Sequence, residues 1–376
     1  MASCKRCGAQ SLLIPNFLGI CKECIKRMSL PEAREVANAI HESILRWWNP
    51  NVGENPKQCK LCANRCSLGT GQTGRCGLWS NVGGKLHFLG HPHTAFLHHY
   101  LDPNPTNCCN AWFCPTGTGV GYPRFALYPG AERGSFNLSV FFYGCNFNCL
   151  FCQNASHSDW LRKSPTQPPQ QASLDQMIEF IVANRKITCI CFFGGSPEPQ
   201  LPFTIQLARR VVAEFPNRVL RVCWEWNGAG NPRLLDRCAE LAAQTGGNLK
   251  FDLKAWNENL HWMLCGTSNQ STLENFAKVG RHFLEHTPPV PALGATTLLV
   301  PGYIDAEEVG AIARFIRSIS PSIPYSLLIF HPDHFFRDLS TTPATQVHSC
   351  LKIAREHLEY VNLGNLSLLG LDGNLE

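Results

Sequence analysis

The chain has 376 residues, of which 44% are hydrophobic and 16% charged, and this ordinary globular composition excludes a mainly disordered protein. No run of about 18 uncharged apolar residues predicts a membrane span. The formal net charge of +5 counts every cysteine as neutral, whereas metal-bound cysteines are thiolates, so the charge does not support a nucleic-acid partner. Because residues 1–6 also lack the apolar start of a secretory signal, we expect a cytoplasmic protein.

Cysteine is the outlier of the composition, with 20 residues. Disulfide-dense frameworks belong to small secreted domains, whereas clustered thiols in a long cytosolic chain more often bind metal. The alternative for any single cysteine is a buried residue that behaves as a small hydrophobe. The spacing of the cysteines therefore has to decide between metal sites and packing.

Residues 1–50 contain two CxxC pairs separated by thirteen residues, and a helix is predicted over 30–48. Each CxxC turn directs two sulfurs at one point, and tetrahedral zinc takes four soft ligands at about 2.3 Å. The pairs predict a structural zinc ribbon, with a rubredoxin-like iron or an unmetallated ribbon as the alternatives. The predicted ligands are Cys4, Cys7, Cys21 and Cys24.

Residues 51–134 form a second cysteine-rich segment. Four of its cysteines are separated by glycines and suit an auxiliary iron–sulfur cluster or a second zinc, and the spacing does not distinguish these metals. They are Cys59, Cys62, Cys66 and Cys76. The pattern assigns no role to Cys108, Cys109 and Cys114. The glycine-rich run at 117–121 lacks the strand-then-helix context of a dinucleotide-binding loop, so we interpret it as an ordinary loop.

From residue 135 to 376, strand-like and helix-like segments alternate. The predicted strands are rich in β-branched and aromatic residues and span 138–143, 187–193, 219–224, 249–253, 296–300 and 325–330. The predicted helices span 174–184, 203–215, 233–243, 305–319 and 345–357. Strands joined by crossover helices form parallel units. Six such units predict an α/β fold with a partial (βα)6 barrel, whose chemistry lies at the carboxyl ends of its strands.

Three cysteines follow the first of these strands directly. Cys145, Cys149 and Cys152 are spaced by three and then two residues, and Phe151 precedes the third. Three thiolates at such spacing hold three corners of a cubic iron–sulfur cluster and leave one iron without a protein ligand. That open iron is a place where a further molecule can bind, and coincidence explains this pattern poorly.

The pattern resembles the CxxxCxΦC signature of the radical S-adenosylmethionine (SAM) superfamily. The resemblance implies a [4Fe-4S] cluster whose open iron is chelated by SAM. It also implies a catalytic role for Cys145, Cys149 and Cys152, because the reduced cluster cleaves SAM to a 5′-deoxyadenosyl radical. Such chemistry further implies an electron donor of the flavodoxin or ferredoxin kind.

The resemblance is closest to proteins related to pyruvate formate-lyase activating enzyme and covers about 59–370. Residues 59–77 are similar to the cysteine-rich opening segment of that group, and residues 297–303 are similar to a later strand-end motif. The N-terminal zinc ribbon is an addition to the simplest activating enzymes. Because added domains usually change the partner or substrate, the exact reaction does not transfer.

Other strand ends carry the same resemblance. Two glycines after the second strand are similar to the family's glycine turn, although Ser196 and Pro197 stand before the acidic residue of this chain. Polar residues after the third strand are placed to bind ribose hydroxyls or a carboxylate, and an Asp-x-Lys pattern follows the fourth. For any one of them, the alternative is a strand-end residue that faces water. The implied cofactor-binding residues are Phe151, Gly194, Gly195, Glu198, Glu225, Asn227, Asp252 and Lys254.

The remaining cysteines are interpreted as buried packing, namely Cys189, Cys191, Cys223, Cys238 and Cys350. Cys265 follows the Asp-x-Lys strand and is left open as a hydrogen-atom donor or cluster ligand. The resulting hypothesis is a radical enzyme that abstracts hydrogen from a protein substrate. Its alternatives are a radical enzyme acting on a small molecule, a lipid or RNA, and a non-enzymatic iron–sulfur electron carrier or scaffold.

Overall fold

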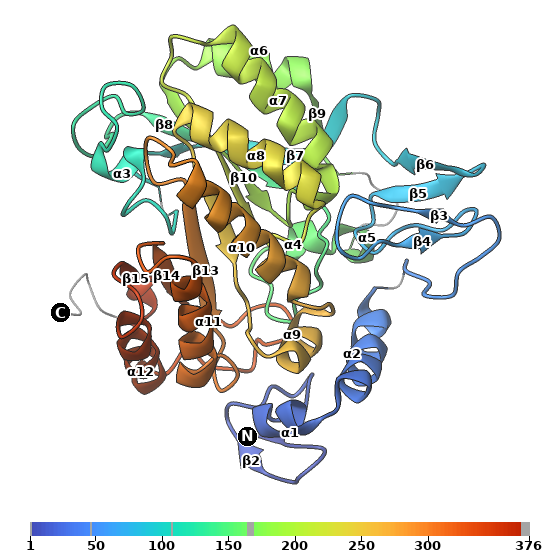
Figure 1. The fold of residues 1–376 in the computed structure, drawn as a ribbon. Helices are drawn as coiled ribbons and strands as arrows, with labels where there is room; N and C mark the ends of the chain where they lie inside the picture. The colour runs from blue at the N-terminus through green and yellow to red at the C-terminus, as the bar shows by residue number, and fades with distance from the viewer. Residues whose placement is uncertain (1, 46, 107, 164–168, 370–376) are drawn as a thin grey trace.

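The computed structural model describes residues 2–45, 47–106, 108–163 and 169–369, and within these ranges its centre is a nine-stranded sheet (Figure 1). Seven parallel strands lie side by side in chain order. They are β8 (Phe136–Phe142), β10 (Ile187–Gly194), β11 (Arg221–Trp226), β12 (Leu249–Asp252), β13 (Leu293–Leu299), β14 (Tyr325–Ile329) and β15 (Val361–Gly364). Beyond β8, the antiparallel strands β7 (Thr94–Pro103) and β9 (Gln171–Ser173) complete the sheet.

Crossover helices cover one face of this sheet (Figure 1). Successive parallel strands are neighbours, so every crossover runs in the same direction and its helix lies on the same side. These helices are α6 (Leu174–Ala183), α7 (Leu201–Glu214), α8 (Pro232–Thr245), α10 (Gln270–Glu285), α11 (Ala306–Ile319) and α12 (Ala344–Arg355). The loop after β7 lies against part of the other face, where Trp112 donates its indole N–H to Ser326 of β14, and the sheet ends at β15 and β9 without closing. The predicted α/β partial barrel is confirmed.

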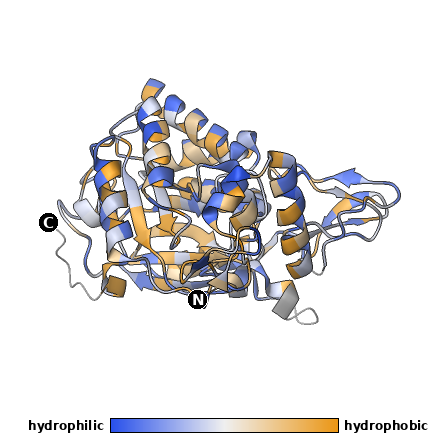
Figure 2. Ribbon diagram, turned by 90° about the horizontal axis from the view of Figure 1, so that it is seen from below, coloured by the Kyte–Doolittle hydropathy of each residue, from blue (hydrophilic) through white to orange (hydrophobic). Residues whose placement is uncertain are grey.

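Alternation along the strands separates the two faces. Trp224 of β11 is fully buried and donates its indole N–H to Thr204 of α7 at 3.1 Å, whereas Cys223 and Glu225 face the inside of the partial barrel. Figure 2 shows that the strands are largely hydrophobic, while the surrounding helices mix hydrophobic and hydrophilic residues. Strand β11 therefore contributes an apolar side chain to the core beneath the helices and polar side chains to the opposite face.

The six predicted strands and the five predicted crossover helices are present with shifts of a few residues at their ends. The helix predicted over 30–48 ends at Ile44. Strands β7, β9 and β15 were not predicted, and neither were α9 (Glu258–Cys265) and α10 between β12 and β13. β7 lies in the 51–134 segment, and its residues 97–103 pair with β8, so this segment contributes directly to the main sheet.

The N-terminal region packs on one end of the molecule. A small hairpin of β1 (Ala2–Ser3) and β2 (Gln10–Ser11) precedes α1 (Lys22–Arg27) and α2 (Leu30–Ile44), and both helices pack against α9. Two hairpins project from the side of the sheet (Figure 1). They are β3 (Lys57–Gln58) with β4 (Ser67–Leu68), and β5 (Trp79–Val82) with β6 (Lys85–Phe88).

Short helical turns complete the chain, namely α3 (Pro115–Thr118), α4 (Ala155–Ser158), α5 (Trp160–Lys163), and the 3-10 turns Glu198–Gln200 and Leu366–Leu369. In the part of the chain that the structure describes, none of the helices combines the length and the apolar character that crossing a bilayer requires.

Candidate active site

A cavity of about 190 Å³ lies at the carboxyl ends of the parallel strands. Its wall brings together residues from the loop after β8 and from the ends of β10, β11 and β12. Of the residues predicted from the sequence, the cavity is lined by Cys145, Cys149, Phe151, Cys152, Gly194, Gly195, Glu225, Asn227, Asp252 and Lys254. Residues that are more than 100 positions apart in the chain thus meet in one place.

The three cysteines sit in the loop that follows β8. Cys145 and Cys149 are buried, and Cys145 Sγ accepts hydrogen bonds from the backbone N–H of Phe147 and from Nδ2 of Asn227, both at 3.3 Å. Burial raises the pKa of Cys152 to about 11. Three thiols that surround one cavity, one of which receives two N–H donors, suit the thiolate ligands of an iron–sulfur cluster, so the residues present fit such a group.

Two glycines fix the cluster loop against the sheet. The backbone N–H of Gly195 donates to Phe142 O at 2.9 Å, and that of Ser196 donates to Gly144 O at 3.1 Å. Gly194 has a φ of +108°, and a Cβ there would lie 2.6 Å from Phe142 N. The sequence analysis related these glycines only to the family's glycine turn. In the structure the crowding comes from the chain itself, because the loop and the sheet approach closely.

Glu198 lies behind the cavity wall instead of lining it. Its side chain is fully buried and accepts a hydrogen bond from Ser196 Oγ. Ser196 lines the cavity, and its Oγ also accepts from the backbone N–H of Asn227 at 3.3 Å. Burial raises the pKa of Glu198 above its ordinary value. The acid therefore reaches the cavity only through Ser196, which the two-residue insertion places there.

A chain of alternating charges forms the opposite wall. Lys250 Nζ lies 2.6 Å from Glu225 Oε2 and 3.6 Å from Asp252 Oδ1, and Lys254 Nζ lies 3.0 Å from Asp252 Oδ2. Burial opposes ionisation of Asp252, but the two lysines hold its pKa below the ordinary value. Sequence reasoning missed Lys250. The signal was present, because Lys250 stands two residues before Asp252 on the same strand and so shares its face.

Cys265 ends α9 beside the cluster loop. It is fully buried, its carbonyl accepts the backbone N–H of Asn148 at 3.0 Å, and a hydrogen bond between its side chain and Cys149 raises the pKa of the Cys149 thiol. The structure therefore places Cys265 beside Cys149. The sequence had left the role of Cys265 open.

The N-terminal segments also touch this loop, which the sequence did not suggest. His41 of α2 is buried and bonds to Asn148, between Cys145 and Cys149. Asn64, in the cysteine-rich segment, donates from Nδ2 to Asn146 O at 2.6 Å. The loop is thus supported from two sides by residues outside the barrel.

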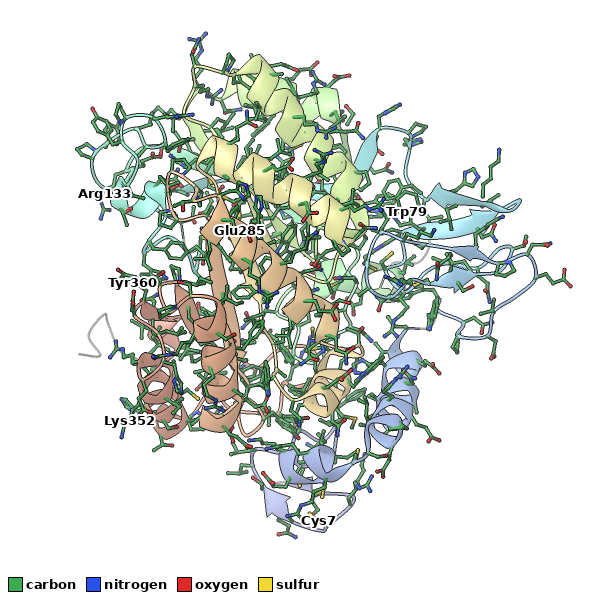
Figure 3. The ribbon with its side chains drawn as sticks, viewed as in Figure 1. Cys7, Trp79, Arg133, Glu285, Lys352 and Tyr360 are labelled. Carbon is green, nitrogen blue, oxygen red and sulfur yellow. The ribbon has the colours of Figure 1, made fainter. Side chains whose placement is uncertain are left out.

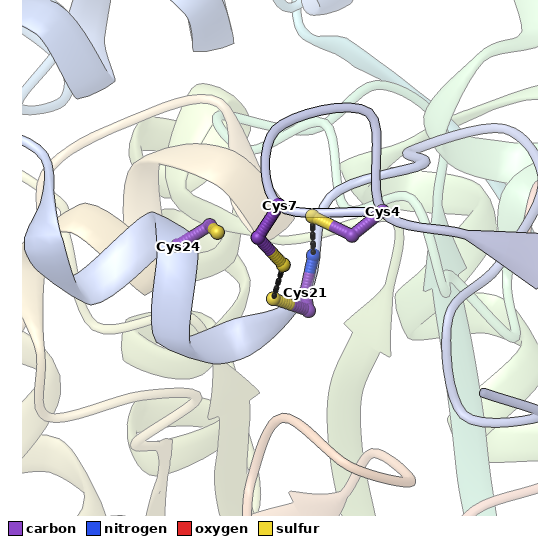
Figure 4. A group of neighbouring side chains, drawn as sticks. All are labelled: Cys4, Cys7, Cys21 and Cys24. Atoms are coloured by element: carbon purple, nitrogen blue, oxygen red, sulfur yellow. Dashed lines mark hydrogen bonds between the residues drawn. The ribbon is translucent and has the colours of Figure 1, made fainter. Parts of the chain in front are cut away.

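The N-terminal cysteines converge as predicted. All four ligand atoms of Cys4, Cys7, Cys21 and Cys24 lie within 4.8 Å of one another (Figure 4). The Sγ atoms of Cys7 and Cys21 are 3.8 Å apart, about the spacing of two thiolates on a tetrahedral ion with 2.3 Å bonds. The backbone N–H of Cys21 donates to Cys4 Sγ at 3.4 Å. These donors fit zinc, and Figure 3 shows Cys7 at the end of the molecule remote from Arg133.

The second set of cysteines is arranged differently. Cys59 and Cys66 are buried and pack with Leu68, and neighbouring thiols together with burial raise the pKa of Cys62. Among the described residues, the structure does not draw Cys59, Cys62, Cys66 and Cys76 into a group with all ligand atoms within 4.8 Å. The metal of this segment, if it binds one, stays a prediction.

Comparison with known proteins agrees with the site. Residues 139–316 match the family model of the radical SAM superfamily. An uncharacterized protein of Methanocaldococcus jannaschii is 24% identical over 325 residues, which cover 84% of this chain and 83% of that protein.

Two named relatives match over shorter stretches. The isethionate sulfite-lyase activating enzyme of Desulfovibrio desulfuricans is 35% identical over 139 residues, 37% of this chain and 40% of that enzyme. A putative glycyl-radical enzyme activating enzyme of Methanocaldococcus jannaschii is 26% identical over 193 residues, 50% of this chain and 66% of the relative. The chain thus spans less than two thirds of these two activating enzymes. The cysteine loop lies inside the matched region, so residues 139–316 form a radical SAM domain, and this domain together with the two activating-enzyme relatives indicates that the chain is an enzyme.

Proposed function

We propose that the protein is an activating enzyme that uses SAM to abstract hydrogen from a polypeptide. Its cluster ligands are Cys145, Cys149 and Cys152. The observation that carries this proposal is that these thiols share one cavity with the glycine turn, Asn227 and the charged wall of β11 and β12. When bound there, a [4Fe-4S] cluster and SAM supply one-electron cleavage to a 5′-deoxyadenosyl radical.

The chain's own residues have separate tasks in this account. Asn227 and the N–H of Phe147 donate to Cys145 Sγ and stabilise its negative charge as a ligand. Lys254 keeps its proton because the carboxylate of Asp252 outweighs the effect of burial on its pKa, so it offers a permanent cation to a carboxylate of the cosubstrate. Glu225 and Asp252 accept hydrogen bonds from hydroxyl or ammonium groups. Phe147 and Phe151 provide apolar contacts in the same cavity.

A polypeptide substrate is favoured by the relatives. The two named relatives are called activating enzymes of a lyase and of a glycyl-radical enzyme, and their names refer to action on another protein. The zinc ribbon at the N-terminus then adds a rigid surface for docking a partner. A radical enzyme acting on a small molecule, a lipid or RNA is the alternative.

Three further assignments belong to the proposal. Zinc at Cys4, Cys7, Cys21 and Cys24 is structural, because four thiolates leave no open coordination position. The four cysteines at 59–76 bind an auxiliary iron–sulfur cluster or a second zinc. Each turnover consumes one electron, which a flavodoxin or ferredoxin-like donor in the cytoplasm supplies.

The proposal is tested by deuterium transfer. Anaerobically reconstituted protein with dithionite and SAM is mixed with extract from cells grown on α-deuterated glycine, separated into macromolecules and small molecules. We expect the macromolecular fraction to yield deuterated 5′-deoxyadenosine. Treating that fraction with protease should abolish this product, whereas treating it with ribonuclease should not. Deuterium transfer from only the small-molecule fraction would establish the alternative, and no 5′-deoxyadenosine from protein with an intact cluster would overturn the enzyme proposal.

A further inference from the structure

The side-chain amide of Asn227 reaches Cys145 from the loop after β11. Its Nδ2 donates to Cys145 Sγ at 3.3 Å and to Asn146 Oδ1 at 2.9 Å. A side-chain amide has a donor at one end and an acceptor at the other, and only the donor end stabilises a thiolate ligand. Whatever keeps the donor end of this amide on the sulfur therefore acts on the cluster.

Asn146 fixes the orientation of the Asn227 amide. With Asn227 reversed, its carbonyl oxygen would face both Asn146 Oδ1 and the sulfur of Cys145, and neither of them offers a proton in the metal-bound state. A cysteine that ligates a metal has lost its own proton, so Asn146 Oδ1 is then left to accept from Asn227. The two asparagines are only 2% and 5% exposed, so bulk water does not replace their hydrogen bond.

Asn64, in the cysteine-rich segment, holds Asn146 in turn. Its Nδ2 donates to the main-chain oxygen of Asn146 at 2.6 Å, and its Oδ1 accepts from Thr267 Oγ1 at 3.3 Å. Both ends of the Asn64 amide are thus engaged, which fixes its own orientation. Asn146 Nδ2 has no partner among the described residues, so the bonds to its Oδ1 and to its main-chain oxygen carry the positioning.

The same segment also contacts the loop that carries Asn227. The backbone N–H of Ala63 donates to Ala229 O at 2.9 Å, two residues after Asn227. Because Ala63 and Asn64 are adjacent in the chain, one short stretch bridges the loop after β8 and the loop after β11. This stretch therefore constrains the distance between Asn227 and the cysteine to which it donates.

We propose that Asn64 and Asn146 are positioning residues that keep the amide of Asn227 directed at the sulfur of the cluster ligand. The cysteine-rich segment thereby helps to set the midpoint potential of the cluster, because an N–H donor stabilises the additional negative charge of the reduced state. This inference rests on the proposed function, since it requires a cluster at the three cysteines after β8. It does not require a metal at residues 59–76.

The experiment measures the midpoint potential of the reconstituted full chain by redox titration and electron paramagnetic resonance. Asn64→Ala and Asn146→Ala are each compared in the unchanged background and together with Asn227→Leu. The spectrum of protein with all three cluster cysteines changed to Ala is subtracted, so that only their cluster is followed. Asn184→Ala is the matched control, because Asn184 Nδ2 also donates to a backbone oxygen, Phe180 O at 2.7 Å, but before the amino end of β10.

We expect Asn64→Ala and Asn146→Ala to make the potential more negative, by no more than Asn227→Leu does, and to add nothing to the shift of Asn227→Leu. The control should leave the potential unchanged. A general loosening of the loop would shift the potential equally in both backgrounds, and this result would overturn the positioning role, as would an unchanged potential. If the protein forms no cluster beyond those of the triple-alanine protein, the proposed function fails and the inference fails with it.

A milder variant covers the case that the asparagine variants do not fold or hold no cluster. Thr267→Val removes the hydroxyl that donates to Asn64 Oδ1 and leaves all three asparagines in place. It should shift the potential in the same direction, and this shift should vanish in the presence of Asn227→Leu. A shift that persists in that background, or no shift at all, would refute the proposal.

Discussion

His41 Nδ1 accepts a hydrogen bond from Asn148 Nδ2, with 3.2 Å between the two nitrogens. The opposite ring nitrogen, Nε2, is 3.1 Å from Met263 O and must donate to that carbonyl, so the imidazole is neutral with its proton on Nε2. One buried side chain of the N-terminal region thus bridges α9 and the loop between Cys145 and Cys149. The stability of the cluster loop is thereby coupled to the N-terminal region.

The first prediction concerns pH. Burial lowers the pKa of His41 and of His261 to about 4, from 6.5. Below pH 6.5 these histidines bind protons in the unfolded chain but stay neutral in the folded chain. The free energy of unfolding therefore falls as the pH drops from about 6.5 to about 4. Each histidine contributes a slope of up to about 1.4 kcal/mol per pH unit. In chemical denaturation at several pH values, the free energy of unfolding of His41→Gln should depend less steeply on pH. The difference should correspond to the uptake of about one proton fewer on unfolding.

The control for this measurement is Thr345→Gln, on the exposed side of α12, which removes no titratable group and should leave the slope as in the unchanged protein. An unaltered slope in His41→Gln would contradict the neutral, buried state of this imidazole.

The second prediction concerns the N-terminal zinc. Cys4→Ser should release one zinc per chain and lower the melting temperature, because a four-thiolate site contributes folding energy directly. Formation of 5′-deoxyadenosine, measured well below the unfolding temperature, should stay largely intact. As the control, the Cys350→Ser protein should keep the zinc at the N-terminal cysteines. Loss of cleavage in the folded Cys4→Ser protein, to the extent seen on removing a cluster ligand, would refute a purely structural role.

The third prediction concerns the donor to Cys145. Asn227→Leu removes the Nδ2–H group 3.3 Å from Cys145 Sγ and should lower cleavage activity by about 10–100-fold, the usual effect of losing a partner of a metal ligand. The midpoint potential of the cluster should become more negative, since one hydrogen bond to sulfur is lost. Redox titration followed by electron paramagnetic resonance measures this shift. Asn217→Leu, an exposed position, is the control, and an unchanged potential in Asn227→Leu would exclude the tuning role.

The fourth prediction concerns the buried ion pair of Arg221 and Glu132. Arg221 Nη2 and Glu132 Oε2 are 2.7 Å apart, with side chains 1% and 0% exposed. Glu132→Gln leaves a buried charge without its partner and should lower the free energy of unfolding by about 3–5 kcal/mol. The matched change Glu240→Gln removes the exposed pair with Arg237 and should cost less than about 1 kcal/mol. Equal losses in urea unfolding would contradict this difference.

The centre of the active site could be predicted from the sequence for a local reason. The x3 and x2 spacing of Cys145, Cys149 and Cys152 follows one strand, and carboxyl ends of parallel strands meet at one edge. The same rule brings Asp252 and Lys254 to the cavity. The position of Glu198 relative to the cavity could not be predicted. It depends on the backbone path of the two inserted residues, Ser196 and Pro197.

The rest depends on long-range packing. β7 contains His98, His99 and Tyr100 without a clean apolar alternation, and its pairing with β8 joins residues about 40 positions apart, which no local pattern records. The shared contact of Cys108 and Cys191 with Glu225 could not be predicted for the same reason. Cys108 and Cys191 are unremarkable in their own segments and meet only because the loop folds back over the inner face of the sheet.

The most direct test of the account is the electron paramagnetic resonance spectrum of the reduced, anaerobically reconstituted protein with and without SAM. A variant that keeps Cys145, Cys149 and Cys152 but carries Cys62→Ser and Cys66→Ser gives the signal of their cluster without a cluster in the 59–76 segment. The account predicts that SAM changes this signal and that 5′-deoxyadenosine then accumulates. An intact cluster whose spectrum is the same with and without SAM, and which forms no 5′-deoxyadenosine, would contradict it.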